Sequence, residues 1–333
     1  MLLDIKVITM LAYFAQIRHN ALQIQPQQVS TPVPGPQQLL VRVRAAGLNR
    51  GEILALHHSA PQQPKPLGAE AAGEILQLGP DCAGFNPGDR VMGRCHGAFA
   101  DAVLMDVQDA MKVPDTLSWV QAGALPISTQ VVHDMLIGQG HLAAGEWLLI
   151  TGVASGVGVA ALQLAKSLGA RVIGTSGSSD KLAALQPLGL DLGIATRRTD
   201  FDDTVLAATD GQGVNLVVNI VGASMLPTCI RALAFQGRLA MVGYMDDEHE
   251  ATLDIRAVHS QRLHLFGVSS KRLSPSQRHR IVQGVVDDIL PRMADPAMQP
   301  LIDRVYPMSQ LAEALERMEA NAQVGKIVMR GLD

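Results

Sequence analysis

The chain has 333 residues, 47% of them hydrophobic and 17% charged, which is typical of a folded protein with about two domains. Its formal net charge of −4 gives no electrostatic reason to expect nucleic acid or an anionic membrane as a partner. Three cysteines make no Cys-x-x-Cys pair, and the first ten residues lack a signal-peptide pattern, so we expect a reducing, cytoplasmic compartment.

The first third of the chain predicts an irregular β domain. Residues 39–45 alternate between apolar and polar side chains, as a half-buried strand does. Glycine and proline then recur between short apolar runs up to about residue 114, with no helical period before about residue 117. The Gln/Pro-rich residues 25–38 are expected to form a surface connection.

Residues 147–170, WLLITGVASGVGVAALQLAKSLGA, predict the central element of the second part. An apolar strand at 147–150 is followed by glycines, by an alanine-rich helix at 159–168 and by a strand at 171–175. This order predicts a βαβ unit whose glycine turn brings a helix N-terminus to the end of the first strand. Free backbone N–H groups and the helix dipole there favour a pyrophosphate, so the stretch indicates a dinucleotide-binding fold.

Two other interpretations of this stretch are weaker. Residues 147–165 carry no charge, but glycine and polar residues interrupt them, which disfavours a membrane span. The same turn matches the T-G-x-x-x-G-x-G fingerprint of short-chain dehydrogenases, which also carry a Tyr-x-x-x-Lys pair. No tyrosine here has a lysine four residues later, because those positions hold Ile17, Glu248 and Gln310.

The rest of the chain predicts alternating strands and helices. Strands are expected at 214–219, 237–243 and 263–267, with a helix at 226–234. This alternation indicates a parallel sheet covered on both faces. Two helices, at 275–292 and 309–321, precede a last strand at 326–329 that we expect to return to the first domain.

Eight short motifs stand in an order that resembles the medium-chain dehydrogenase/reductase superfamily, and within it the zinc-free quinone oxidoreductase (zeta-crystallin-like) branch. They are Ala46-Gly47-Leu48-Asn49, Leu67-Gly68 with Glu70 and Ala72-Gly73, Gly88-Asp89-Arg90-Val91 with Gly93, Gly97-Ala98-Phe99-Ala100, Ala124-Leu125-Pro126, Ser155-Gly156-Val157-Gly158, Gly237-Arg238 and Gly325-Lys326-Ile327-Val328. The resemblance implies an α/β protein with a GroES-like β-barrel domain and a Rossmann doubly wound parallel-sheet domain. We expect residues 1–127 and 270–333 to form the GroES-like catalytic domain and residues 128–269 the dinucleotide-binding domain.

The residues argue against a catalytic metal. Zinc-dependent relatives hold Zn²⁺ with cysteine and histidine, and the matching positions here are Asn49 and Ala69. Without a Lewis acid, oxidation of a simple alcohol is difficult. Hydride delivery to an electron-poor carbon needs less help, which favours quinones or α,β-unsaturated carbonyl compounds.

The end of the second predicted strand favours NADP(H). NAD-preferring sites place an acid about 20 residues past the glycines, where this chain has Gly177 between hydroxyl residues. Ser178 and Lys181 follow, and the resemblance gives Lys181 a role in binding the phosphate. A solvated helix start, with Asp180 as its cap, is the alternative. Whether Arg197 contributes stays open.

The resemblance implies the remaining site residues. Asn49 and Glu52 are the expected catalytic positions, but we expect no obligatory side-chain acid, with the product's proton coming from water or the cofactor ribose. The cofactor-binding positions are Ser155, Gly156, Val157, Gly158, Ser178, Lys181, Asn219, Val221, Gly243 and Lys326. His57 and His58, in an expected loop, and Ser128 and Thr129 stay open.

The sequence thus predicts a zinc-independent, NADPH-dependent oxidoreductase acting on a small-molecule quinone or conjugated carbonyl. An enoyl or acrylate-type double-bond reductase and a non-catalytic NADPH-binding regulatory protein are the alternatives. We expect a homodimer joined through the strand at 263–267, because the outer edge of a sheet's last strand has unpaired backbone groups.

Overall fold

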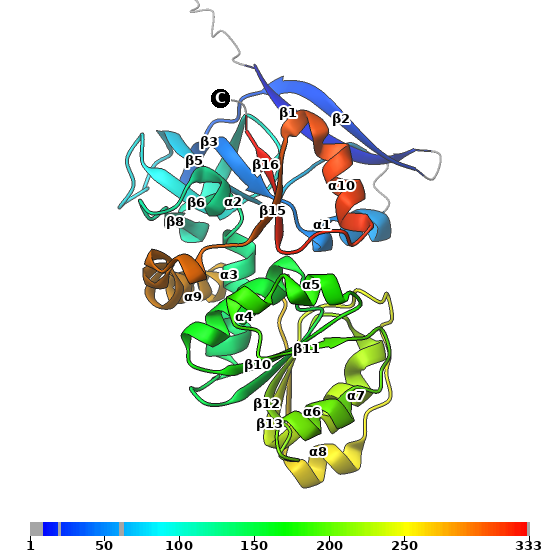
Figure 1. Ribbon diagram of the computed structural model, residues 1–333. Helices are drawn as coiled ribbons and strands as arrows, with labels where there is room; N and C mark the ends of the chain where they lie inside the picture. Colours follow the sequence, from blue (N-terminus) through cyan, green and yellow to red (C-terminus); the bar gives the residue numbers. More distant parts are fainter. Residues whose placement is uncertain (1–8, 19–20, 60–62, 332–333) are drawn as a thin grey trace, which may run out of the picture. The chain divides into compact units, whose positions relative to one another are not determined.

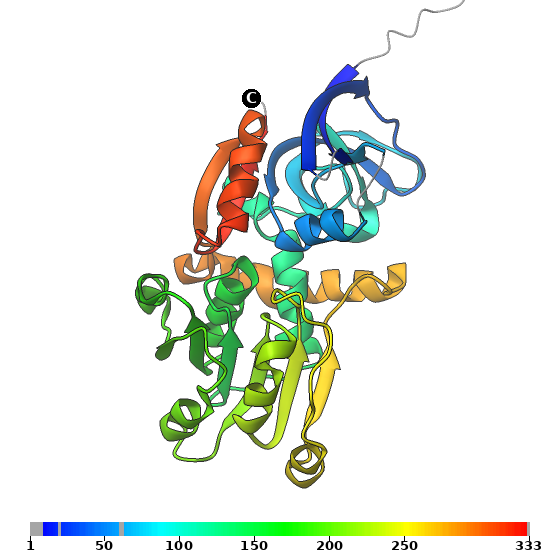
Figure 2. The same ribbon diagram turned by 90° about the vertical axis from the view of Figure 1, so that its right-hand side faces the viewer.

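The computed structural model describes residues 9–18, 21–59 and 63–331, and Figures 1 and 2 show it from two sides. These residues fall into two compact units, one formed by the chain up to Ile127 and from Ile302 onward, the other by Ser128–Leu301. The sequence analysis placed the division at the same point, between 127 and 128, but assigned residues 270–301 to the first domain. They pack in the second unit, where Gln163 donates to the carbonyl oxygens of Ala297 and Gln299.

The first unit contains two β-sheets whose strand pairs are mostly antiparallel. Its strands are β1 (Thr9–Arg18), β2 (Ala21–Ser30), β3 (Gln38–Gly47), β4 (Lys65–Pro66), β5 (Glu70–Leu78), β6 (Arg90–Arg94), β7 (Ala102–Asp106), β8 (Ala110–Lys112), β15 (Ile302–Pro307) and β16 (Lys326–Arg330). The small sheet has the order β2-β1-β4, and the large one the order β15-β16-β3-β5-β6-β8, with β7 pairing with β3. β16 therefore returns to this unit, as the sequence predicted.

Two expectations for this region were wrong. β2 pairs with β1 along its whole length, so residues 25–30 belong to a strand and not to a surface connection. A helix, α1 (Arg50–Ser59), also precedes residue 117. Its Ile53 and Leu56, three residues apart, are both buried, so one face of this short helix packs on the core. His57 and His58 thus belong to a helix and not to a loop.

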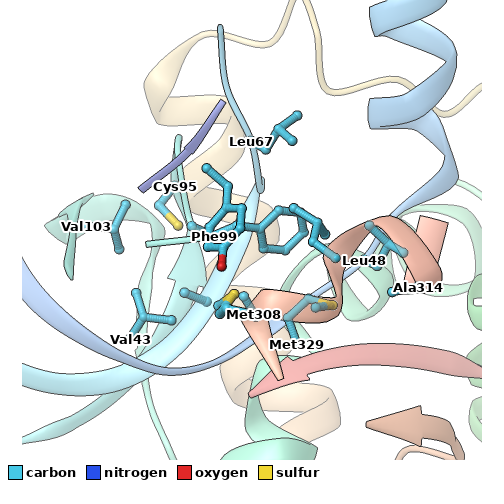
Figure 3. Packing of buried hydrophobic residues seen from close by; sticks show 14 of the residues in the cluster. Val43, Leu48, Leu67, Cys95, Phe99, Val103, Met308, Ala314 and Met329 are labelled. Carbon is cyan, nitrogen blue, oxygen red and sulfur yellow. The ribbon is translucent and has the colours of Figure 1, made fainter. Parts of the chain in front are cut away.

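The core of the first unit joins the two ends of the chain. The described helices there are α1, α2 (Trp119–Gly123), α3 (Pro126–His133), which crosses into the second unit, and α10 (Leu311–Glu319). Figure 3 shows Phe99 and Leu48 packed against Met308, Ala314 and Met329 from the C-terminal segment. Late residues therefore complete a hydrophobic core that the first third of the chain begins.

The second unit is a six-stranded parallel sheet with the order β11-β10-β9-β12-β13-β14. Its strands are β9 (Trp147–Thr151), β10 (Arg171–Ser176), β11 (Leu192–Ala195), β12 (Val214–Asn219), β13 (Leu233–Met241) and β14 (His264–Gly267). Its helices include α4 (Gly156–Ser167), α5 (Ser179–Ala183), α6 (Asp202–Ala208), α7 (Leu226–Arg231), α8 (Ile255–Gln261) and α9 (Pro275–Gly284). α4 covers one face of the sheet and α6, α7 and α8 the other (Figure 1). This order is that of a doubly wound dinucleotide-binding fold, as predicted.

Two segments of the second unit differ from the prediction. The helix expected at 226–234 ends at Arg231, and β13 begins at Leu233, four residues before the predicted strand. The helix expected at 275–292 changes after Gly284 into a π-helical turn, η5 (Val285–Ile289). Among the described residues, no helix is both long and apolar enough to cross a membrane.

A half-buried ion pair in the first unit generates a stability prediction. Arg317 donates to both carboxylate oxygens of Asp303, at 2.6 and 2.9 Å, and the Val324 amide donates to the same carboxylate at 3.0 Å. Asp303→Ala should lower the free energy of unfolding by about 2–3 kcal/mol, because the guanidinium and the amide lose their acceptor. Urea denaturation measures the loss.

The exposed pair Arg198–Asp200 is the matched control for this prediction. Asp200→Ala should change the free energy of unfolding by less than about 1 kcal/mol, because water screens an exposed pair. Equal losses in the two variants would contradict a specific role for Asp303.

Candidate active site

Four polar side chains from distant parts of the chain meet inside the first unit. Asn49 stands between β3 and α1, and Glu52 lies in the first turn of α1. Glu70 begins β5, and Lys326 begins β16. The sequence analysis selected three of these residues separately, and the structure brings them together around Glu70.

Lys326 and Glu70 form the centre of this cluster. Lys326 Nζ donates to Glu70 Oε1 at 2.6 Å and to Asn49 Oδ1 at 2.8 Å. Glu70 is fully buried and Lys326 only 6% exposed, so each charge depends on its partner for solvation. Glu70 stood in a family motif of the sequence, but its role in the site was missed because no sequence signal pairs it with a lysine 256 residues later.

Hydrogen bonds fix the other members of the cluster. Asn49 Nδ2 donates to Glu70 Oε1 at 2.8 Å and to Glu52 Oε1 at 3.1 Å. Glu70 Oε2 accepts from the Ile127 amide at 2.7 Å. The Asn49 amide is therefore oriented by three neighbours, with its oxygen toward the ammonium and its nitrogen toward the two carboxyl groups.

Glu52 is the member of the cluster whose pKa is clearly shifted. Burial raises its pKa to about 7 and the charge of Glu70 adds to the rise, whereas bonds from Asn49 and the Gly68 amide and the charge of Lys326 oppose it. Near neutral pH this side chain can therefore both hold and release a proton. Such a pKa is characteristic of groups that transfer protons.

Gly47 leaves space for the cluster, and Gly68 allows a close approach of the chain beside it. A Cβ atom on Gly47 would lie 2.2 Å from Glu70 Oε1. Gly68 has φ +97°, and a Cβ there would lie 2.7 Å from the Phe99 nitrogen. Both glycines belong to motifs that the sequence analysis singled out.

The cluster does not suit a catalytic zinc ion. Of the two positions that match zinc ligands, Asn49 has a neutral amide already bonded to its neighbours, and Ala69 has no donor. The nearby Cys95 is buried, and burial and the charges of Glu70 and Glu52 raise its pKa well above the usual value, so it stays a thiol. Within residues 9–18, 21–59 and 63–331, no three His, Cys, Asp or Glu side chains are arranged to hold a metal.

The glycine turn of the second unit presents a helix N-terminus. Ser155 caps α4, and its hydroxyl accepts a hydrogen bond from the Gly158 amide at 3.1 Å. A Cβ on Gly158 would lie 2.6 Å from the Val153 carbonyl oxygen, so a larger residue would push the turn apart. The first-turn amides of Gly156 and Val157 have no acceptor inside the helix, which makes this turn suitable for a pyrophosphate.

The end of β10 carries cations and hydroxyls where an acid would select NAD. Arg197 lies against Gly177, since a Cβ on that glycine would be 2.7 Å from Arg197 Nε. Ser178 caps α5 and accepts from the Lys181 amide at 3.4 Å. This arrangement fits a phosphate group, and it assigns a place to Arg197, which the sequence analysis left open.

Three further predicted cofactor positions shape the adjoining loops. Asn219 is fully buried; its Oδ1 accepts from Thr151 Oγ1 and the Gly222 amide, and its Nδ2 donates to the Gly222 carbonyl at 2.8 Å. The Val221 amide also donates to Thr151 Oγ1. A Cβ on Gly243 would lie 2.8 Å from the Ile220 carbonyl oxygen. The Asn219 side chain thus ties β9 to the loop after β12.

The sequence analysis left the roles of four further residues undecided. Ser128 and Thr129 are buried in α3, in the second unit. The side chains of His57 and His58 lie outside the described part of the chain.

Known proteins resemble the chain along almost its whole length. The family model described as "Alcohol dehydrogenase GroES-like domain" matches residues 35–115, and the one described as "Zinc-binding dehydrogenase" matches residues 156–286. The "Quinone oxidoreductase-like protein 2 homolog" of Nematostella vectensis is 28% identical over 309 residues, covering 90% of this chain and 83% of the relative. "Polyketide synthase GfsB" of Streptomyces halstedii is 28% identical over 316 residues, covering 92% of this chain.

The chain spans only 5 to 14% of the length of the first polyketide synthases that it matches. Among solved structures, the mycobacterial protein Rv1454c complexed with NADPH is similar with a TM-score of 0.86. That likeness covers 96% of this chain and 99% of the other at 24% identity, which shows a shared fold. The two family models in succession, the sheet order and the full-length relative together show that the chain belongs to the medium-chain dehydrogenase/reductase superfamily, in its quinone oxidoreductase-like branch.

Proposed function

We propose that the protein is a metal-independent oxidoreductase that uses NADPH to reduce quinones or α,β-unsaturated carbonyl compounds. The observation that carries the proposal is the Lys326–Glu70–Asn49–Glu52 cluster, which holds an ammonium ion and a titratable carboxyl group against Asn49, one of the two positions that match zinc ligands. NADPH, when bound, would supply the hydride. We propose that it acts in the cytoplasm or another reducing compartment.

The cofactor assignment rests on the second unit. The amides of Gly156 and Val157 and the capped turn from Ser155 to Gly158 suit the pyrophosphate. Ser178, Lys181 and Arg197 would hold the 2′-phosphate through charge-assisted hydrogen bonds. The loops set by Asn219, Val221 and Gly243 would orient the rest of the dinucleotide.

A second candidate is an enoyl-type double-bond reductase. Several of the matched relatives are polyketide synthases, among them "Highly reducing polyketide synthase lcsB" of Purpureocillium lilacinum, 29% identical over 300 residues. Both candidates need hydride addition followed by a proton. Product analysis after incubation with NADPH separates them, and a protein that binds NADPH but reduces no quinone or enone would be the non-catalytic alternative.

The phosphate pocket generates the first functional prediction. Lys181→Ala should weaken NADPH binding by roughly 1.5–3 kcal/mol, the range for a charge-assisted hydrogen bond, and leave NADH binding nearly unchanged. Arg197→Ala should act in the same way. Titration calorimetry with both cofactors measures the effect.

The control for both variants is Arg198→Ala, because the neighbouring Arg198 is exposed and paired with Asp200. This variant should keep the NADPH affinity. Equal losses of affinity for NADPH and NADH in the Lys181 and Arg197 variants would contradict the assignment of these residues to the 2′-phosphate.

Metal independence is the second prediction. Because Asn49 and Ala69 give no zinc site, the purified protein should contain substoichiometric zinc by elemental analysis and keep its NADPH oxidation after chelator treatment. Stoichiometric zinc together with chelator-sensitive turnover would refute it.

The third prediction is a homodimer joined along β14. This strand is the last of its sheet, its outer edge has no partner strand in the described chain, and Leu265 is 37% exposed. Light scattering at micromolar concentration should give twice the chain mass of 35.4 kDa. Leu265→Pro should weaken the dimer because it removes a backbone donor. A folded variant with unchanged dimer affinity would place the interface elsewhere.

A further inference from the structure

The polar cluster of the first unit contains more acid than base. Two carboxyl groups, Glu52 and Glu70, share the single ammonium ion of Lys326. Cys95, the other titratable group close to both carboxyl groups, is a neutral thiol because burial raises its pKa. One of the two carboxyl groups is therefore unmatched by a cation and favours the protonated form.

Hydrogen bonding decides which carboxyl group holds that proton. Glu70 accepts three hydrogen bonds, from Lys326, Asn49 and the Ile127 amide. Glu52 is bonded by Asn49 at 3.1 Å and by the Gly68 amide, and lacks a direct bond to the ammonium ion. Glu52, whose pKa is raised to about 7, is therefore the carboxyl group that can hold a proton near neutral pH.

Exposure decides which group can pass its proton on. Glu70 is fully buried and Lys326 is 6% exposed, whereas Glu52 and Asn49 are only half-buried. Glu52 is thus the titratable residue of the cluster with more exposure than the buried pair.

We infer that Glu52 is the proton donor that completes reduction of an α,β-unsaturated carbonyl substrate, with Asn49 and Lys326 as its positioning residues. The inference rests on the proposed function and names one chemical step within it.

The proposed step transfers a proton from Glu52 to the reduced substrate. Reduction of the C=C bond adds one hydride, with its electron pair, and one proton. The hydride bonds to the β carbon and leaves an enolate. The O–H bond of Glu52 breaks, a C–H bond forms at the α carbon with the enolate's electron pair, and the carboxylate left behind takes a new proton from water.

The surrounding charges give this donor a defined pH range. Burial and the charge of Glu70 raise the pKa of Glu52 to about 7, against the opposing effects of Asn49, Lys326 and the Gly68 amide. The protonated fraction therefore falls as pH rises through about 7. Turnover with an enone should fall over the same range.

The test compares two acceptors in the full-length chain. With NADPH and cyclohex-2-enone, Glu52→Gln should lower kcat by roughly 10²–10⁴-fold, the usual contribution of a general acid, and abolish the fall in turnover near pH 7. With benzoquinone the loss should be less than about tenfold, because the hydroquinone anion is weakly basic and takes its proton from water. Glu52→Asp, which restores an acid, should recover part of the enone activity.

The control is Glu313→Gln, which removes an exposed carboxylate of α10 and should leave both activities unchanged. Equal losses of Glu52→Gln with both acceptors, or no loss with the enone, would overturn the donor role while leaving the proposed function intact. If the wild type oxidises NADPH with neither acceptor, the proposed function fails and the donor role fails with it.

A second measurement needs no cofactor or turnover. A carboxyl group whose pKa is raised on folding destabilises the folded protein as pH rises from the ordinary value, near 4.5, to about 7. Glu52→Gln lacks this group, so its melting temperature relative to wild type should increase between pH 5 and pH 8. A difference that does not change with pH would show that Glu52 has no raised pKa and would overturn the inference.

Discussion

The buried ion pair between Lys326 and Glu70 is the constraint on which the first unit depends. Neither charge reaches water, so each would be costly to bury without the other. Their contact fixes the start of β16 against the start of β5. Asn49 and the Ile127 amide use the remaining bonding capacity of the pair, which leaves little freedom in how these segments meet.

The proposed cofactor site of the second unit is built differently from the polar cluster of the first unit. The surface that we propose for phosphate binding consists mainly of backbone amides and small residues, because a Cβ at Gly158 or Gly177 would take up the space that the turn or Arg197 occupies. The Thr151–Asn219 hydrogen bond joins the carboxyl ends of two neighbouring strands at the point where the strand order reverses. In the second unit the proposed site is therefore formed mainly by the backbone of the fold. In the first unit the candidate site is formed by four side chains.

Much of the fold of the second unit could be predicted from the sequence, because strong local sequence patterns specify its elements. The glycine turn between two apolar runs predicted β9, α4 and β10, and β12 has the predicted bounds. Weak local signals failed: Ile53 and Leu56 are the buried residues among the side chains described for α1, and β2 is rich in glutamine and contains a proline. Their structures are set by tertiary contacts that no short window of sequence contains.

The same distinction holds within the site. Asn49, Glu52 and Lys326 could be selected because they stand in recognisable motifs. That Glu70 joins them could not be predicted, since β5 and β16 must both pair with β3 before side chains 256 positions apart in the chain can meet. Arg197 was equally hidden, because β11 must pair with β10 before its side chain can lie over Gly177.

The distance along the chain between Glu70 and Lys326 has a consequence for biosynthesis. At typical translation rates of about 5–20 residues per second, the 256 residues between them take roughly 13–50 s to synthesise. For most of that interval the nascent first unit lacks its ammonium ion and the core side chains Met308, Ala314 and Met329, while the whole second unit is synthesised. The nascent chain therefore presents an open hydrophobic core and an uncompensated carboxylate until its last strand arrives, and products of premature termination are expected to be recognised by chaperones and proteases.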